Sequence, residues 1–100
     1  EKEPALLLGD FNEAAPIDTL TGMNKFYTSK NLKPAISLSE LKKDQEKHFT
    51  YSSGNPKRKI DYIFYASKYI QKLSSGTVRE QNLISDHLPV MMTFKLINVE

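Results

Sequence analysis

Three short apolar stretches, each bordered by acid, amide or imidazole side chains, constrain the fold of this chain more than any other feature. The apolar run at residues 5–8 is followed by the sequence GDFN at residues 9–12. The sequence KIDYIF occupies residues 59–64, and SDHLPV occupies residues 85–90. Short apolar runs that end at turn residues indicate β-strands. Since enzymes built on sheets carry reactive groups at strand ends, these motifs form the candidate site.

The overall composition is that of one soluble globular domain. The chain has 100 residues, of which 39% are apolar, and no linker, repeat or low-complexity tract divides it. We therefore treat residues 1–100 as a single segment. Residues 1–4 lead directly into an expected strand, and we expect natural sequence to precede them. No apolar run approaches the roughly 20 residues of a membrane-spanning helix.

Charge and cysteine content exclude several classes of site. The 14 basic and 12 acidic residues give a net charge of +2, which by itself is too small to indicate a nucleic-acid partner. Lys57, Arg58 and Lys59 are clustered beside Asp61, either as a rim that attracts phosphate or as a solvated loop. The chain has no cysteine, so disulfides, thiolate zinc sites and cysteine nucleophiles are excluded.

The pattern as a whole predicts an α+β fold with mostly antiparallel strands. We expect a buried strand at residues 5–8, and further strands at residues 49–51, 60–65, 77–79 and 90–96. Residues 74–76 have turn composition and precede the strand expected at residues 77–79. The last strand alternates apolar and other residues, which predicts one buried face.

One helix is expected at residues 20–30, with Asp18 or Thr19 as its N-terminal cap. Its apolar side chains have helical spacing and predict a core-facing stripe, which consists of Leu20, Met23, Phe26 and Tyr27. Residues 39–47 form either one charged helix or a solvated loop. His48 follows this charged run, and we expect it to lie on the surface.

Asp10 and Asn12 flank Phe11 at the end of the first apolar run. If the backbone stays extended there, both polar side chains point to one side and Phe11 points into the core. A carboxylate at a strand end accepts a proton from water or holds a hard cation, and a neighbouring amide donates to a phosphoryl oxygen. The alternative is a tight turn, because Gly, Asp and Asn all favour turns.

Asp61 lies within an apolar strand, where an unpaired carboxylate is costly. One natural partner is an imidazole N–H, and the pairing would fix the tautomer of that histidine. The alternative is an Asp61 at the first exposed position of the strand, paired with Lys59 or Arg58.

His87 stands just before the last expected strand, either as a site residue or as an ordinary structural or exposed histidine. The adjacent Asp86 is a metal ligand, a local turn acceptor or a helper of the imidazole. Thr50 either hydrogen bonds near the site or is an ordinary strand residue.

Taken together, the motifs resemble a known family. The order GDFN, Thr50-Tyr51, IDYIF and SDHLPV, from Leu6 to Leu96, resembles the C-terminal half of the endonuclease/exonuclease/phosphatase superfamily, the deoxyribonuclease-I-like hydrolases. The wording is most similar to bacterial and deadenylase-like members. The resemblance implies a phosphoesterase that depends on Mg²⁺ or Mn²⁺. It also implies one sheet with a flanking helix, as the C-terminal half of a four-layer α/β/β/α sandwich.

The resemblance also implies roles for the site residues. Asp10 orients or deprotonates the attacking water, and Asn12 contacts the scissile phosphate. Asp61 pairs with His87, which works on the phosphate or on proton transfer. Asp86 and Asp10 are implied as metal ligands, and Thr50 as a supporting residue.

Two departures from the family pattern stand out. Many members carry Arg two residues before the strand Asp, where this chain has Lys59, with Arg58 one position earlier. The N-terminal half of the family fold, which supplies a principal Glu ligand and a second catalytic His, is not part of this sequence. We expect that half as a partner in the same domain, and we expect the isolated piece to be inactive and to expose the face that meets it.

The substrate class stays open at this stage. The resemblance implies a phosphate ester as partner, with DNA, RNA, sphingomyelin and phosphoinositides as the candidates. The site motifs do not distinguish these substrates, because selectivity lies in loops such as residues 31–48. The alternative function is a catalytically silent module of the same fold that binds a phosphorylated ligand or a protein. No prediction of localisation follows from the sequence.

Overall fold

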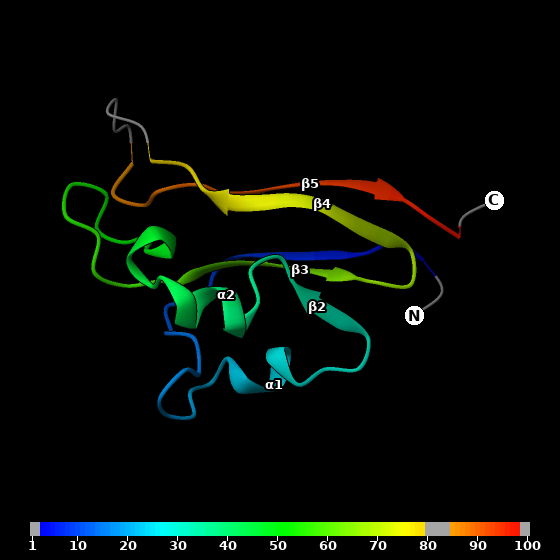
Figure 1. Cartoon of the computed structure of the whole chain (residues 1–100), viewed down its shortest axis with the longest axis horizontal. Helices are drawn as coiled ribbons and strands as arrows, with labels where there is room; N and C mark the ends of the chain where they lie inside the picture. Colours follow the sequence, from blue (N-terminus) through cyan, green and yellow to red (C-terminus); the bar gives the residue numbers. More distant parts are fainter. Residues whose placement is uncertain (1–2, 80–84, 99–100) are drawn as a thin grey trace.

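The computed structural model describes residues 3–79 and 85–98, which form short strands and helices (Figure 1). In chain order the elements are β1 (Leu6–Asp10), α1 (Asn24–Tyr27), β2 (Leu32–Pro34), α2 (Leu38–Lys43), the 3₁₀-helix η1 (Glu46–His48), β3 (Asp61–Ala66), β4 (Ile70–Thr77) and β5 (Val90–Leu96). This content makes the fold α+β. None of the helices in the described ranges is both long and apolar enough to cross a membrane.

The strands form two antiparallel sheets. One has three strands in the order β1-β3-β2, and the other consists of β4 and β5. The expectation of one sheet is therefore wrong for the described part of the chain. In Figure 1 the β4–β5 pair runs along one side of β1 and β3, whereas α1, α2 and β2 lie on the other side. The two sheets meet where β5 contacts β3.

The core lies on one face of β3. Tyr62, Phe64 and Ala66 are buried and alternate with partly buried residues, as the period of two along a strand requires. Met23 packs against Tyr62 and Phe64, and partly buried apolar side chains surround this cluster: Phe11, Ala15, Phe26, Tyr27 and Leu32. The prediction that Phe11 points into the core is therefore confirmed.

The helix expected at residues 20–30 is shortened to the single turn of α1. Local side-chain hydrogen bonds compete with the helix at both ends, because the Met23 N–H donates to Thr21 Oγ1 at 3.2 Å and Thr28 Oγ1 donates to the Asn24 carbonyl at 3.0 Å. Met23 occupies the N-cap position without a side-chain cap, so the expected caps at residues 18 and 19 are wrong. Leu20 is 81% exposed and does not join the core stripe.

The charged run at residues 39–47 forms most of α2 and part of η1, with a break at residues 44–45, so it is neither the one continuous helix nor the loop that the sequence left open. A capping box begins α2: the Glu40 N–H donates to Ser37 Oγ at 3.1 Å, and the Ser37 N–H donates to Glu40 Oε1 at 2.9 Å. The expectation that His48 lies on the surface is wrong, because it is only 4% exposed. The strand β4 packs against η1, and Thr77 Oγ1 donates to the His48 carbonyl at 3.4 Å.

The strand boundaries differ from expectation at two places. Residues 74–76 do not form a turn before a strand at residues 77–79 but lie inside β4, where their partners in β5 complete the ladder. The pairing of β4 with β5 shifts register between Lys72 and Ser74, as at a β-bulge. The strand expected at residues 49–51 is reduced to isolated bridges at Tyr51.

The strands β1 and β5 leave apolar surface open. The strand at β1 is present, but its residues are exposed rather than buried, with Leu8 at 61%. The strand β5 has the expected bounds, yet none of its residues is buried, so the expected buried face is wrong. Phe94 and Leu96 are 40% and 53% exposed. Both strands therefore present an uncovered apolar surface in this chain.

Candidate active site

The strand register places two carboxylates side by side at one end of the three-stranded sheet. Asp10 is the residue directly opposite Asp61 in the antiparallel pair of β1 and β3. Opposed residues project from the same face of a sheet, and like charges at such positions destabilise the pair. Gly9, just before Asp10, has φ of +148°, a conformation that L side chains rarely adopt. Because the carboxylates of Asp10 and Asp61 repel each other, a cationic group near both of them is favoured.

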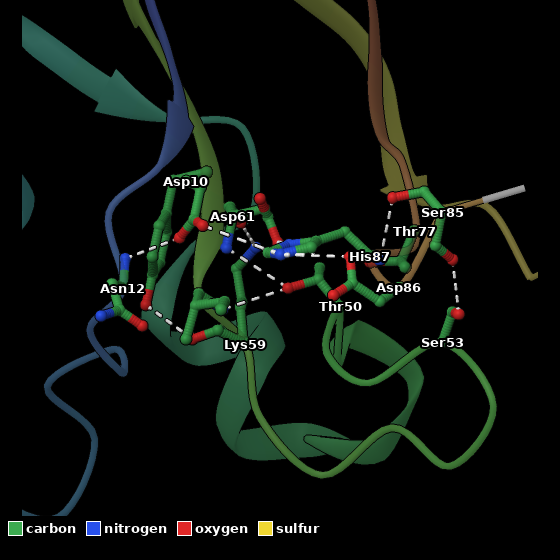
Figure 2. Close-up of polar contacts among 12 residues, drawn as sticks. Asp10, Asn12, Thr50, Ser53, Lys59, Asp61, Thr77, Ser85, Asp86 and His87 are labelled. Carbon is green, nitrogen blue, oxygen red and sulfur yellow. Dashed lines mark hydrogen bonds and ion pairs between the residues drawn. The ribbon is translucent and has the colours of Figure 1, made fainter.

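The imidazole of His87 approaches both acids (Figure 2). Its Nδ1 lies 2.7 Å from Asp61 Oδ2, and its Nε2 lies 3.7 Å from Asp10 Oδ2. Asp86 Oδ1 is 3.9 Å from the same Nε2. The hydrogen bond to Asp61 is the largest cause that raises the pKa of His87, and the nearby acids add to it. In the tautomer that suits this geometry, Nδ1–H donates to Asp61 and Nε2 faces Asp10 and Asp86.

A bracket of residues 50–53 holds the backbone around His87. The N–H of Leu88 donates to the Thr50 carbonyl at 2.7 Å, and the N–H of Ser53 donates to the Asp86 carbonyl at 2.7 Å. Ser53 Oγ also donates to the Ser85 carbonyl at 2.6 Å, as Figure 2 shows. The loop that carries His87 is therefore anchored on both sides of the histidine.

Thr50 also supports the start of β3. It is fully buried, and its Oγ1 accepts hydrogen bonds from the N–H groups of Ile60 and Asp61, at 3.1 and 3.3 Å. Its backbone carbonyl accepts from Leu88. One residue thus connects the strand that carries Asp61 to the loop that carries His87.

Lys59 contacts Asp61 through the backbone rather than through the carboxylate. It is 6% exposed, and its Nζ donates to the Asp61 carbonyl at 2.6 Å while lying 4.5 Å from the centre of the Tyr62 ring. Burial lowers the pKa of Lys59 to about 8. Arg58 is exposed and uses its own carbonyl to accept from the Thr50 and Tyr51 N–H groups. The carboxylate of Asp61 is therefore left to His87.

Asn12 lies beside Asp10 but not in an extended strand. Its φ is +53°, and its N–H donates to Asp10 Oδ1 at 2.8 Å, which is the turn geometry that Asp and Asn favour. The expected extended arrangement is therefore wrong, and the tight-turn alternative describes the backbone. This local bond engages Asp10 Oδ1, while Oδ2 is the oxygen that approaches His87.

The residues present fit a divalent metal ion in their chemistry. Ligand atoms of Asp10, Asp61 and His87 all lie within 4.8 Å of one another, with Asp86 also near Nε2. Carboxylate oxygens are the protein ligands that Mg²⁺ and Mn²⁺ prefer. Asp61 already binds His87, so Asp10 and Asp86 would be the carboxylates available to hold an ion. Their side chains are 47% and 70% exposed.

A cleft of about 280 Å³ adjoins the site. One wall consists of residues of β1 and β3, including Leu8, Asp61 and Ile63, and the other of Ser85 and residues 87–90. The cleft therefore adjoins the Asp61–His87 pair and extends to the exposed side chain of Leu8 on β1.

Sequence reasoning did not single out Tyr51, Ser53 or Ser85, although each contacts the His87 loop. The ring centroids of Tyr51 and His87 are 5.0 Å apart, and Ser53 Oγ donates to the Ser85 carbonyl. For Tyr51 the Thr-aromatic motif was a usable signal. Ser85 lies within the motif at residues 85–90, but no sequence signal connects it to Ser53, which it contacts across 32 residues of sequence.

An imidazole paired with one carboxylate and facing two others is an arrangement that is able to accept a proton from water. Comparison with known families agrees with this chemistry: the model of the Endonuclease/Exonuclease/phosphatase family matches residues 1–87. The chain belongs to this family, whose members are generally phosphoesterases and nucleases that use a divalent metal. No curated protein and no solved structure matched the chain.

Proposed function

We propose that this chain contributes the His87 half of the active site of a divalent-metal-dependent phosphoesterase, in which activated water attacks phosphorus. The observation that carries the proposal is the position of the His87 imidazole, 2.7 Å from Asp61 and 3.7 Å from Asp10. The neighbouring carboxylates of Asp61 and Asp10 orient the imidazole and stabilise its cationic form. This form suits proton transfer and the stabilisation of a charged phosphoryl group.

Each side chain has a role in this proposal. Asp61 holds Nδ1–H of His87, so that Nε2 faces the position of the phosphate. Asp10 and His87 are the two candidate bases for the attacking water, and Asn12 donates to a phosphoryl oxygen through its amide. A bound Mg²⁺ or Mn²⁺, held by Asp10 and Asp86, would supply neutralisation of the developing negative charge.

We also propose that a further part of the same domain covers the exposed apolar side chains of β1 and β5. Leu6, Leu8, Phe94 and Leu96 are all at least 40% exposed, and apolar patches of this kind mark interaction surfaces. The expected N-terminal half of the fold is the partner of this surface. It would also supply the ligands that complete the metal site. The four-layer sandwich is part of this proposal.

Nucleic acid is one candidate substrate, and the exposed residues Lys57 and Arg58 support it. They line a second cleft of about 270 Å³ together with residues 14–15 and 17–19, which follow Asn12 in the chain. Cations in this position would contact phosphates flanking the reacting one. Lowering of binding affinity with salt would report these contacts.

The test is hydrolysis by the longest native chain that contains this segment. The substrates are single- and double-stranded DNA, RNA, sphingomyelin, a phosphoinositide and a generic phosphodiester, each with Mg²⁺, with Mn²⁺ and with a chelator. We expect metal-dependent turnover that falls by about 10²–10⁴-fold in His87→Ala, the usual contribution of an acid–base residue. Near-normal turnover in a folded His87→Ala protein would contradict the assignment. A folded protein that cuts nothing but binds phosphate esters would favour the silent module.

A further inference from the structure

The aromatic ring of Tyr51 lies against the imidazole of His87. The centroids are 5.0 Å apart and the planes are inclined by 57°. Tyr51 also forms isolated β-bridges with both Arg58 and His87, so its backbone sits between the segment leading into β3 and the loop that carries the histidine. The side chain is partly buried. Tyr51 is therefore fixed by the same bracket that anchors His87.

The hydrogen bond to Asp61 alone does not fix the plane of the His87 ring. One contact at Nδ1 sets a distance, but the imidazole can still rotate about its side-chain bonds, and terminal torsions of this type have broad energy wells. The side chain of His87 is 27% exposed, so the solvent side does not confine it. A ring packed against one face removes much of this freedom. The position of Nε2 relative to Asp10 then depends on that packing.

We propose that Tyr51 is a positioning residue, whose ring packs against the His87 imidazole and keeps Nε2 directed toward Asp10. This inference rests on the proposed function of His87 and adds to it the group that sets the orientation of the ring. Tyr51 acts through His87 and has no role as a proton donor or acceptor in the reaction.

The ring of Tyr51, rather than its hydroxyl, carries this role. Among the described residues the hydroxyl takes part in none of the hydrogen bonds, whereas the backbone N–H and carbonyl of Tyr51 both bond to Arg58. A Tyr51→Phe protein therefore keeps both the ring and the bracket. A Tyr51→Leu protein keeps apolar volume and the backbone bonds but loses the aromatic face.

The experiment compares these variants in the longest native chain, with Tyr65→Leu as a matched control. Tyr65 is also partly buried, and it lies four residues beyond Asp61 in β3. Proton–nitrogen NMR of histidine rings follows the Nδ1-bound proton and the ring protons of His87, assigned by their loss in His87→Gln. We expect Tyr51→Leu to broaden the Nδ1-proton signal and to shift the ring protons, since the ring current of Tyr51 is removed. Tyr51→Phe and Tyr65→Leu should retain the native signals.

Kinetics provides the second measurement. We expect Tyr51→Leu to lower kcat by about threefold to tenfold with KM unchanged, because this is the size of effect that the loss of one aromatic contact produces. Unaltered His87 signals in Tyr51→Leu would overturn the inference, as would a loss in Tyr51→Phe equal to that in Tyr51→Leu. A change confined to KM would also overturn it, because it would mean contact with substrate. If the native protein hydrolyses nothing, the proposed function fails on its own, and the NMR result alone decides the contact.

Discussion

Lys59 gives the sharpest quantitative prediction, because it is a buried cation whose desolvation is visible in its pKa. Burial lowers the pKa of Lys59 from 10.5 to about 8. The unfolded chain therefore still binds a proton at pH values where the folded chain has released it. By linkage, stability must then rise with pH from just below 8 up to 10.5, which is the sign expected for a cation destabilised by folding. With these two pKa values, the contribution of Lys59 to the free energy of unfolding increases by about 1 kcal/mol between pH 7 and pH 9.

The assay is urea unfolding of the longest native chain at pH 7, 8 and 9, with Lys59→Met and Lys42→Met variants. Lys42 lies exposed on α2, so Lys42→Met should keep the native slope, whereas Lys59→Met should lose this part of the rise. The range stops at pH 9 because burial raises the pKa of Tyr27 and of Tyr62, and the ionisation of these groups in the unfolded chain opposes the trend above that pH. Equal slopes in the native and Lys59→Met proteins would refute the assignment of a desolvated Lys59 cation.

Three further predictions concern the site and its supports. Asp61→Asn should lower kcat by about 10-fold to 100-fold, because a hydrogen bond between charged groups is worth about 1.5–3 kcal/mol. If Asp61 acts through His87, the Asp61→Asn/His87→Ala double variant should lose no more kcat than His87→Ala alone. Losses that multiply in the double variant would contradict this coupling. Thr50→Val should lower the free energy of unfolding by about 1–3 kcal/mol, since it removes the acceptor for two N–H groups, and Thr50→Ser should restore most of it in urea titrations; equal stabilities of the Val and Ser variants would argue against a role for the hydroxyl. Burial is the main cause that lowers the pKa of His48 below its value in the unfolded chain. The contribution of neutral His48 to stability is therefore complete above about pH 6.5. It is lost on acidification, because the unfolded chain takes up the proton first. The unfolding of a His48→Phe protein, measured from pH 7 to pH 5 in a His87→Gln background, should be less sensitive to acid, and an unchanged slope would mean that His48 is not desolvated.

The use of a His87→Gln background in the last measurement follows from the opposite sign of the second histidine. The pKa of His87 is raised by its bond to Asp61, so its contribution to stability is present at low pH and is lost as the pH rises through the folded pKa. The two histidines therefore oppose one another in any acid titration of the whole protein. They can be separated only by substitution.

Several elements of the fold were accessible from sequence because their causes are local. The strand β5 was predicted with its correct bounds, and β3 to within one residue, since apolar and β-branched composition and flanking turn residues act over a few positions. The helix α1 was overestimated because hydroxyl groups at residues 21 and 28 hydrogen bond to nearby backbone, which no apolar periodicity reveals. The strand β4 was misplaced because turn composition at residues 74–76 was overridden by pairing with β5.

What the sequence by itself determined was the chemical inventory and the family. The motifs at residues 9–12, 59–64 and 85–90 specify acids, an amide and an imidazole at strand ends, and a match to a family pattern needs only their order along the chain. The tertiary structure decided the geometry: the opposition of Asp10 and Asp61, the burial of Lys59 and His48, and the ring of Tyr51 against His87. These contacts depend on strand register and on packing between segments that are distant in sequence, such as the 26 residues that separate Asp61 from His87. Local patterns carry no direct record of such pairings, because each is the result of burying the whole core at once.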